Sequence, residues 1–180
     1  MLKITVPAIE LWDEQKEIFV DIKEQTLCLE HSLVSLSKWE SKWHKPFLTK
    51  DEKTDAEMRD YVRCMTLTQN VDPMIYDYLT SDNLNSIYKY IEDPMTATVI
   101  NDRRSGRGSS EQPTAELIYY WMVACNIPFE CQKWHINRLM TLIRICGIKN
   151  QPPKKMSRNE ILSRNAALNQ SRRNRLHSRG

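Results

Sequence analysis

The sequence predicts an α+β fold: a small N-terminal antiparallel β-sheet of about three strands, a mostly α-helical body, and a C-terminal basic helix with a tail. Apolar and polar residues alternate near the N-terminus, and apolar residues recur at helical spacing after residue 36. A change in charge after residue 150 marks off the end of the chain. We therefore expect one α+β domain over residues 1–150, with a β-meander over 1–36 and mainly helices over 37–150. A basic helix and tail follow over residues 151–180.

The strands are expected at residues 2–6, 17–22 and 26–33. Pro7 ends the first of them, and a charged turn at residues 13–16 precedes the second. In the third, three leucines share one face and His31 lies between them. Short strands with brief connections predict an antiparallel meander that has one covered face.

The first helix is expected to begin at Ser37, because Ser37-Lys38-Trp39-Glu40 fits a capping box, and to end at Pro46. Trp39 and Trp43 are four residues apart, which places both on one face, where they are expected to close over the sheet. Helical spacing then predicts a helix over 55–67 and two short helices between 73 and 90.

The second half of the body is expected to hold a β-strand at 96–100, a mobile loop at 101–112, and two long helices. Thr114 caps the first long helix, over 115–126, and Gly147 stops the second, over 129–146. Pro128 separates them and predicts a helical hairpin. Ser157 and Glu160 form another capping box, which opens a helix that is expected to fray from Asn169 onward.

The charge is unevenly distributed. The chain has 180 residues, of which 26 are Lys or Arg and 23 are Asp or Glu, so its net charge is +3. Eight of the basic residues and a single acidic residue follow residue 150, which gives +7 to the last 30 residues and −4 to the first 150. There is no apolar run long enough for a membrane helix and no signal peptide pattern, and the scattered cysteines indicate reduced thiols of an intracellular protein.

The motifs of common enzymes and metal sites are missing from the sequence. Cys131 and His135 are four residues apart on one expected helix and are weak candidates for metal ligands, but two further ligands are not in reach. There is no nucleophile elbow, zinc-protease motif or phosphate-binding glycine loop. We therefore predict a protein that is not an enzyme, has no catalytic residues and needs no cofactor.

Two groups of residues are candidates for contacts with partners. The aromatic side chains of Trp39, Trp43 and residues 119–121 are suited to anchor a partner protein, although helically spaced aromatic residues more often form core. The second group lies in the basic tail and consists of Arg172, Arg173 and Arg175. These arginines are suited to phosphates of a nucleic acid or to acidic groups of a protein, and a solubilising tail remains the alternative.

Three stretches resemble a family of small proteins encoded among the tail genes of tailed bacteriophages, often described as tail assembly chaperones. They are residues 29–47 (LEHSLVSLSKWESKWHKPF), 127–139 (IPFECQKWHINRL) and 156–169 (MSRNEILSRNAALN). The resemblance implies a non-enzymatic role in the host cytoplasm: binding the long helical tape-measure protein while tail-tube subunits assemble around it. Oligomers are compatible with this role.

The alternatives are a structural component of the virion, at the head–tail connector or baseplate, and a phage DNA-binding protein that uses the basic tail.

Overall fold

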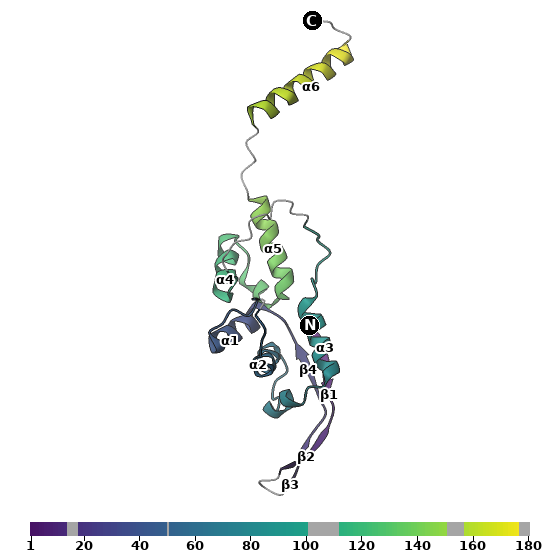
Figure 1. Cartoon of the computed structure of the whole chain (residues 1–180), viewed down its shortest axis with the longest axis vertical. Helices are drawn as coiled ribbons and strands as arrows, with labels where there is room; N and C mark the ends of the chain where they lie inside the picture. The colour runs from purple at the N-terminus through teal and green to yellow at the C-terminus, as the bar shows by residue number, and fades with distance from the viewer. Residues whose placement is uncertain (14–17, 50, 101–111, 151–156, 177–180) are drawn as a thin grey trace. The chain divides into compact units, whose positions relative to one another are not determined.

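The computed structural model of the chain describes residues 1–13, 18–49, 51–100, 112–150 and 157–176. Its strands and helices confirm the α+β class (Figure 1). The chain divides into two compact units, Met1–Gly147 and Ile148–Gly180. None of the helices in the described ranges combines the length and the apolar character that crossing a membrane requires.

The N-terminal strands form a single long β-hairpin. β1 (Leu2–Val6) pairs with β4 (Gln25–Leu29), and β2 (Ile9–Asp13) pairs with β3 (Ile18–Ile22), both in antiparallel register. In every pair of both ladders the two residue numbers add up to 31. The register is therefore the same in both, and the two ladders belong to one hairpin. Pro7 has no N–H group to contribute to the ladder, which explains the interruption after β1.

The predicted three-stranded meander is therefore wrong in detail. The described residues contain four strands in two two-stranded ladders, because residues 9–13 are a strand that the sequence analysis missed. The last predicted strand, 26–33, ends at Leu29, since the chain turns into a helix four residues later. Most of the predicted charged turn at residues 13–16 lies outside the described residues.

The first helix, α1 (Leu33–Trp43), begins four residues before the predicted start. Its capping box is formed by Ser32 and Ser35: the Ser32 hydroxyl accepts the backbone N–H of Ser35, and the Ser35 hydroxyl accepts the backbone N–H of Ser32. The box predicted at Ser37 and Glu40 is thus wrong. His44 ends α1 in the left-handed conformation, with φ 52°.

Local capping chemistry also determines where the next helices begin. Thr54 caps α2 (Asp55–Met65) through a full capping box with Glu57, and Asp72 caps the 3₁₀ helix η1 (Pro73–Tyr78). Threonines cap the two helices that follow, α3 (Ser81–Glu92) and α4 (Ala115–Ala124), and the cap of α4 is the predicted Thr114. The expected helices at 55–67, between 73 and 90, and at 115–126 are thereby confirmed within a few residues.

The end of this unit differs from the prediction. The helix expected at 129–146 is two helices, the 3₁₀ helix η2 (Phe129–Lys133) and α5 (Ile136–Lys149), and α5 continues through Gly147 instead of stopping there. Residues 96–100 contain no strand. The loop predicted at 101–112 lies, apart from Gln112, outside the described residues.

The core of the first unit is arranged around α1, which packs against α2, α4 and η2, while α3 packs against β1 (Figure 1). Alternation along the strands directs Ile4, Val6, Leu27 and Leu29 into the core. The largest side chains that are almost fully buried come from most of the elements: Trp39, Tyr61, Leu33, Leu36, Met65, Ile75, Ile87, Ile118, Met122 and Ile136.

A buried carboxylate joins α1 to α4. Glu40 lies in α1 and is 7% exposed. Its Oε1 accepts the N–H of Phe47 at 2.8 Å, and its Oε2 accepts the N–H of Ala115, the first residue of α4, at 2.7 Å. Burial raises the pKa of this carboxyl, and the two N–H donors partly offset that increase.

The second unit contains α6 (Arg158–Leu176). Its predicted capping box is confirmed: Glu160 accepts the N–H of Ser157 at 2.8 Å, and the Ser157 hydroxyl accepts the N–H of Glu160 at 3.2 Å. The fraying expected from Asn169 is not seen, because the helix continues to Leu176. Pro152 and Pro153 lie outside the described residues.

We predict that Glu40→Ala lowers the free energy of unfolding by about 2–4 kcal/mol, because two buried N–H groups lose their acceptor. Glu40→Gln keeps one acceptor oxygen, so we expect about half of that loss. Urea denaturation followed by tryptophan fluorescence measures both. Glu130→Ala, which removes an exposed carboxylate, is the control and is expected to change stability by no more than about 0.5 kcal/mol. Equal stability of Glu40→Ala and the control would contradict the assigned role.

Candidate functional site

Two histidines that are distant in sequence meet in the core. His31 precedes α1, His135 precedes α5, and both are buried. Their ring centroids are 5.0 Å apart with an interplanar angle of 75°. An isolated antiparallel bridge between Ser32 and His135, with the N–H of Ile136 donating to the carbonyl of His31 at 2.7 Å, holds the two segments together.

Hydrogen bonds fix the protonation of His135. Its Nε2 lies 2.9 Å from the carbonyl oxygen of Tyr90, which only accepts, so Nε2 carries the proton. Its Nδ1 accepts the backbone N–H of Asn137 at 3.3 Å, so His135 is a neutral ring with both nitrogens engaged. The Nδ1 of His31 bonds to the hydroxyl of Tyr61.

The surroundings favour the uncharged form of each of these groups. Burial, with a smaller effect from His135, lowers the pKa of His31 to about 3, and burial also lowers the pKa of His135. Burial raises the pKa of Tyr61 above its ordinary value. At neutral pH the cluster therefore works as an uncharged polar connection between the hairpin, α2 and α5.

The structure does not place Cys131 and His135 on one helix, as the metal hypothesis required. Cys131 is buried in η2, which ends at Lys133, and Trp134 is extended. Because both ring nitrogens of His135 already have partners, the ring offers no free nitrogen to a metal in this arrangement. The described residues contain no group of three or more His, Cys, Asp or Glu that could hold a metal ion.

The two tryptophans of α1 were expected to close over the sheet, but they pack toward α2. Their rings are stacked, with centroids 6.1 Å apart. The Nε1 of Trp39 donates to the carbonyl of Glu57, and the Nε1 of Trp43 donates to Asp60, both at 2.9 Å. Trp39 is fully buried and Trp43 is half-buried, so only Trp43 has ring surface available for a partner.

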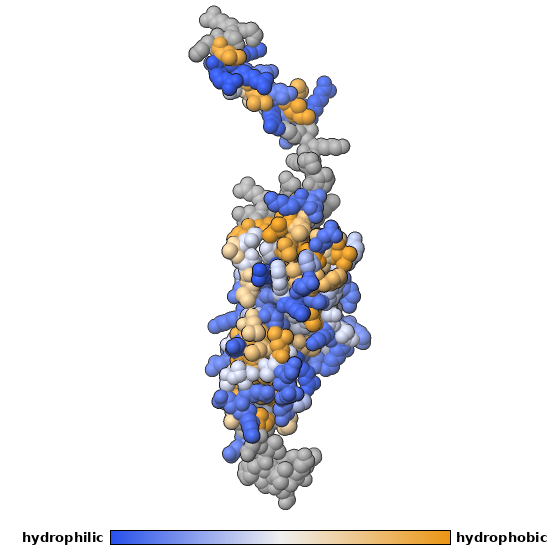
Figure 2. Space-filling model, turned by 180° about the vertical axis from the view of Figure 1, so that it is seen from behind, coloured by the Kyte–Doolittle hydropathy of each residue, from blue (hydrophilic) through white to orange (hydrophobic). Residues whose placement is uncertain are grey.

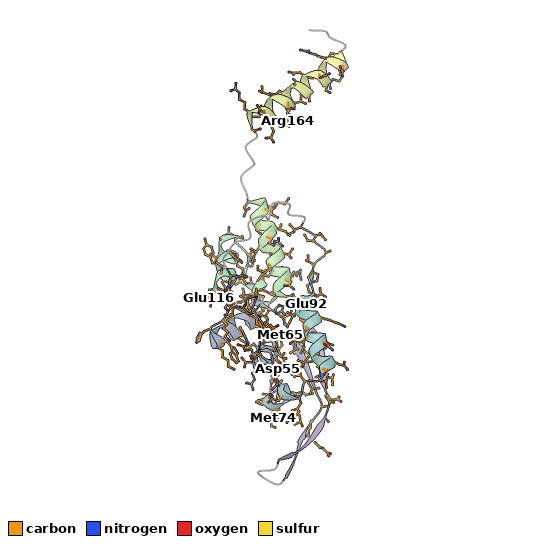
Figure 3. All side chains as sticks on the ribbon, in the orientation of Figure 1. Asp55, Met65, Met74, Glu92, Glu116 and Arg164 are labelled. Carbon is orange, nitrogen blue, oxygen red and sulfur yellow. The ribbon has the colours of Figure 1, made fainter. Side chains whose placement is uncertain are left out.

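An exposed apolar surface lies on α4 and η2. The inner face of α4 buries Ile118 and Met122, whereas Tyr120 and Val123 on its outer face are 65% and 58% exposed. Phe129 of η2 is 54% exposed. We call Tyr120, Val123 and Phe129 the α4–η2 surface. Apolar residues gather at the α4–α5 end of the unit (Figure 2), and the labelled Glu116 lies in the first turn of α4 (Figure 3).

The backbone that carries the α4–η2 surface is tightly held. α4 ends in a Schellman motif: Asn126 is left-handed with φ 52°, and its N–H donates to the carbonyl of Val123. The N–H of Ile127 donates to the carbonyl of Met122 at 2.8 Å. The hydroxyl of Tyr119 then donates to Gln132 in η2 at 2.9 Å. The surface is therefore pre-organised, which reduces the entropy lost on binding.

The sequence analysis identified part of this surface. It singled out residues 119–121 as possible anchors but missed Val123 and Phe129. The available signal was the composition of α4, in which Glu116 is the only charged residue, so that no polar face is left for solvent. The three predicted arginines, Arg172, Arg173 and Arg175, are exposed on α6.

Comparisons with models of known protein families, with curated proteins and with solved structures found no match. The candidate surfaces are therefore argued from the geometry of this chain.

We predict that the folded chain loses stability as the pH falls below about 6.5. Because the pKa of His31 drops from 6.5 to about 3 on folding, the unfolded state binds more protons between these pH values. The free energy of unfolding then decreases by up to about 1.4 kcal/mol per pH unit. His31→Gln should flatten this slope in urea titrations between about pH 7 and 4. Tyr61→Phe should lower stability at every pH and keep the slope; an unchanged slope in His31→Gln would contradict the prediction.

We also predict opposite effects for two substitutions at Asn126. Asn126 has a φ of 52°, in the left-handed region, which asparagine tolerates better than alanine because its polar side chain can hydrogen-bond locally. Asn126→Ala should therefore lower the free energy of unfolding by about 1 kcal/mol. Asn126→Gly adopts this conformation without strain and should match or exceed the wild-type stability. Thermal denaturation of the pair measures the difference, and an alanine variant as stable as the glycine variant would show that the Schellman motif does not constrain this turn.

Proposed function

We propose that this chain is a non-enzymatic tail-morphogenesis protein of a tailed bacteriophage, which acts as an assembly chaperone by binding the tape-measure protein in the host cytoplasm. The observation that carries the proposal is the exposed apolar α4–η2 surface. The resemblance of residues 29–47, 127–139 and 156–169 to phage tail assembly chaperones supports the same role.

The chemistry of the α4–η2 surface suits an amphipathic helix. Its three large apolar side chains can cover the apolar stripe of a helical partner. Glu116 and Glu130 are exposed on the same two elements and would face basic residues at the edge of that stripe. A long helical protein without its assembly partners exposes such stripes and aggregates, so covering them is the chemical task of a chaperone.

Binding to this surface requires little change in the chain. The Schellman motif at Asn126 and the bond from Tyr119 to Gln132 already hold α4 and η2 together. We therefore expect a partner to dock on a preformed face.

We predict that co-expression with the tape-measure protein encoded in the same genome keeps that protein soluble and allows both to be purified together. The double variant Val123→Ser, Phe129→Ser should fold, because both side chains are exposed, and should weaken binding at least tenfold, or about 1.4 kcal/mol. Leu67→Ser with Met74→Ser is the matched control, since it removes two exposed apolar side chains outside α4 and η2.

The proposal fails if the solubility of the tape-measure protein does not depend on the wild-type chain. Equal loss of binding in the test and control variants would instead remove the α4–η2 surface as the site. Mass spectrometry of purified virions tests the alternative role, because a structural component would be present in mature particles in fixed stoichiometry.

A further inference from the structure

Two thiols from different helices of the first unit lie next to each other. Cys125 caps the C-terminus of α4, and Cys146 lies near the end of α5. A hydrogen bond joins the two side chains, which places one sulfur atom beside the other. The chain between them contains η2 and most of α5, so this contact is produced by the fold and not by proximity in the sequence.

Both thiols lie at the boundary between the core and the solvent. Each side chain is half-buried and packs against the hydrophobic core of the first unit. Cys131, in η2, is buried instead. The pair therefore combines a fixed position, which comes from packing, with partial access for a small reagent.

Cys28 and Cys64 serve as a comparison for this pair. Cys28 lies in β4 and Cys64 in α2, and both are half-buried. The ionisable groups that act on the Cys64 thiol include no second thiol and are all charged residues: Asp60, Lys38, Lys42 and Arg63. Partial exposure is thus shared by four cysteines, and it is the contact between thiols that points to Cys125 and Cys146.

The position of Cys125 leaves room for the geometry of a disulfide bond. Its φ of −94° and ψ of 4° lie outside the regular helical values, because Cys125 is the residue at which α4 ends. A small change of its backbone can therefore bring the sulfur atoms to bonding distance without unwinding α4. Burial, the charge of Cys146 and the hydrogen bond from its side chain raise the pKa of Cys125, so the Cys125 side chain rests as a thiol at neutral pH.

We propose that Cys125 and Cys146 form a reversible redox pair, which a low-molecular-weight disulfide such as oxidised glutathione converts to a disulfide bond between α4 and α5. One cysteine thiolate attacks oxidised glutathione, whose S–S bond breaks, so that a mixed disulfide forms and one glutathione thiolate leaves. The second cysteine thiolate attacks the cysteine sulfur of the mixed disulfide and releases the second glutathione. The chain loses two electrons and two protons, and the two reduced glutathione molecules take them up.

The disulfide bond closes a loop that carries part of the α4–η2 surface. Phe129 lies inside this loop, and Val123 lies two residues before Cys125. Closing a loop restricts the unfolded chain and so stabilises the folded one. Oxidation therefore ties the end of α4 and η2 to α5. The inference rests on the two thiols and does not depend on the proposed chaperone function.

The test treats the reduced full chain with oxidised glutathione at about pH 8, where thiolates become available, and follows the products by mass spectrometry. We expect Cys125 and Cys146 to lose one hydrogen atom each and to carry no glutathione. Cleavage after Lys, Arg and Glu separates Cys125 from Cys131, because Glu130 lies between them, so the cross-linked peptide identifies the bonded pair. The oxidised chain should melt about 6–12 °C above the reduced chain, and dithiothreitol should reverse this shift.

Two variants separate the pair from general thiol reactivity. Cys146→Ser removes the second thiol, so the reaction should stop at the mixed disulfide, with glutathione on Cys125 and no rise in melting temperature. Cys28→Ser with Cys64→Ser is the matched control, because it removes two half-buried thiols outside the pair. The control should form the same cross-linked peptide as the wild type.

A further control oxidises the wild-type chain unfolded in urea. The yield of the bond between Cys125 and Cys146 should fall about tenfold there, because the fold no longer holds the two thiols together.

Three results would overturn the proposal: no bond between Cys125 and Cys146 in the folded wild type, a bond from either of them to Cys131 or to a second chain in its place, or an equal yield of the bond from the unfolded chain. A failed chaperone assay with the bond intact would remove the proposed function and leave this inference in place.

Discussion

The position of α4, and with it the α4–η2 surface, depends on the buried carboxylate of Glu40. Its two oxygens accept N–H groups of Phe47 and Ala115, and Ala115 is the first residue of α4. Burying a carboxylate costs several kcal/mol, while hydrogen bonds to a charged group return about 1.5–3 kcal/mol each. The net stabilisation is therefore small, and the main effect of Glu40 is specificity, since α4 in any other position would leave the charge unpaired.

A second set of hydrogen bonds holds α5 in its position. The bridge between Ser32 and His135 joins the start of α5 to the start of α1, and His135 donates to Tyr90 at the end of α3. The side chain of Asn137 donates to the carbonyls of Ile91 and Asp93, at 2.9 and 2.8 Å, and so satisfies the C-terminus of α3. Segments distant in sequence are thus held by polar bonds inside an apolar core.

The same long-range bonds explain which parts of the fold could be predicted from the sequence. The starts of α4 and α6 were predicted well because each capping residue and its partner lie within four residues of each other, whereas α2 was predicted from the helical spacing of its apolar residues. The start of α1 was not, since Glu40 reaches Ala115 and is not available to cap Ser37. Likewise, the break before α5 depends on the contact of His135 with Tyr90, which no local pattern reveals. The exposure of Val123 and Phe129 also follows from tertiary packing, although the apolar composition of α4 was a signal for it.

The two candidate surfaces have opposite chemistry, which argues against one ligand for both. The α4–η2 surface is apolar with exposed carboxylates at Glu116 and Glu130, so a phosphate backbone would be repelled there. α6 carries five arginines and one glutamate, for a net charge of +4, so acidic groups are the counter-charges that it requires. The first 150 residues carry a net charge of −4 and the last 30 carry +7, so the two parts of the chain favour ligands of opposite charge. A net charge of +3 averages over both and describes neither.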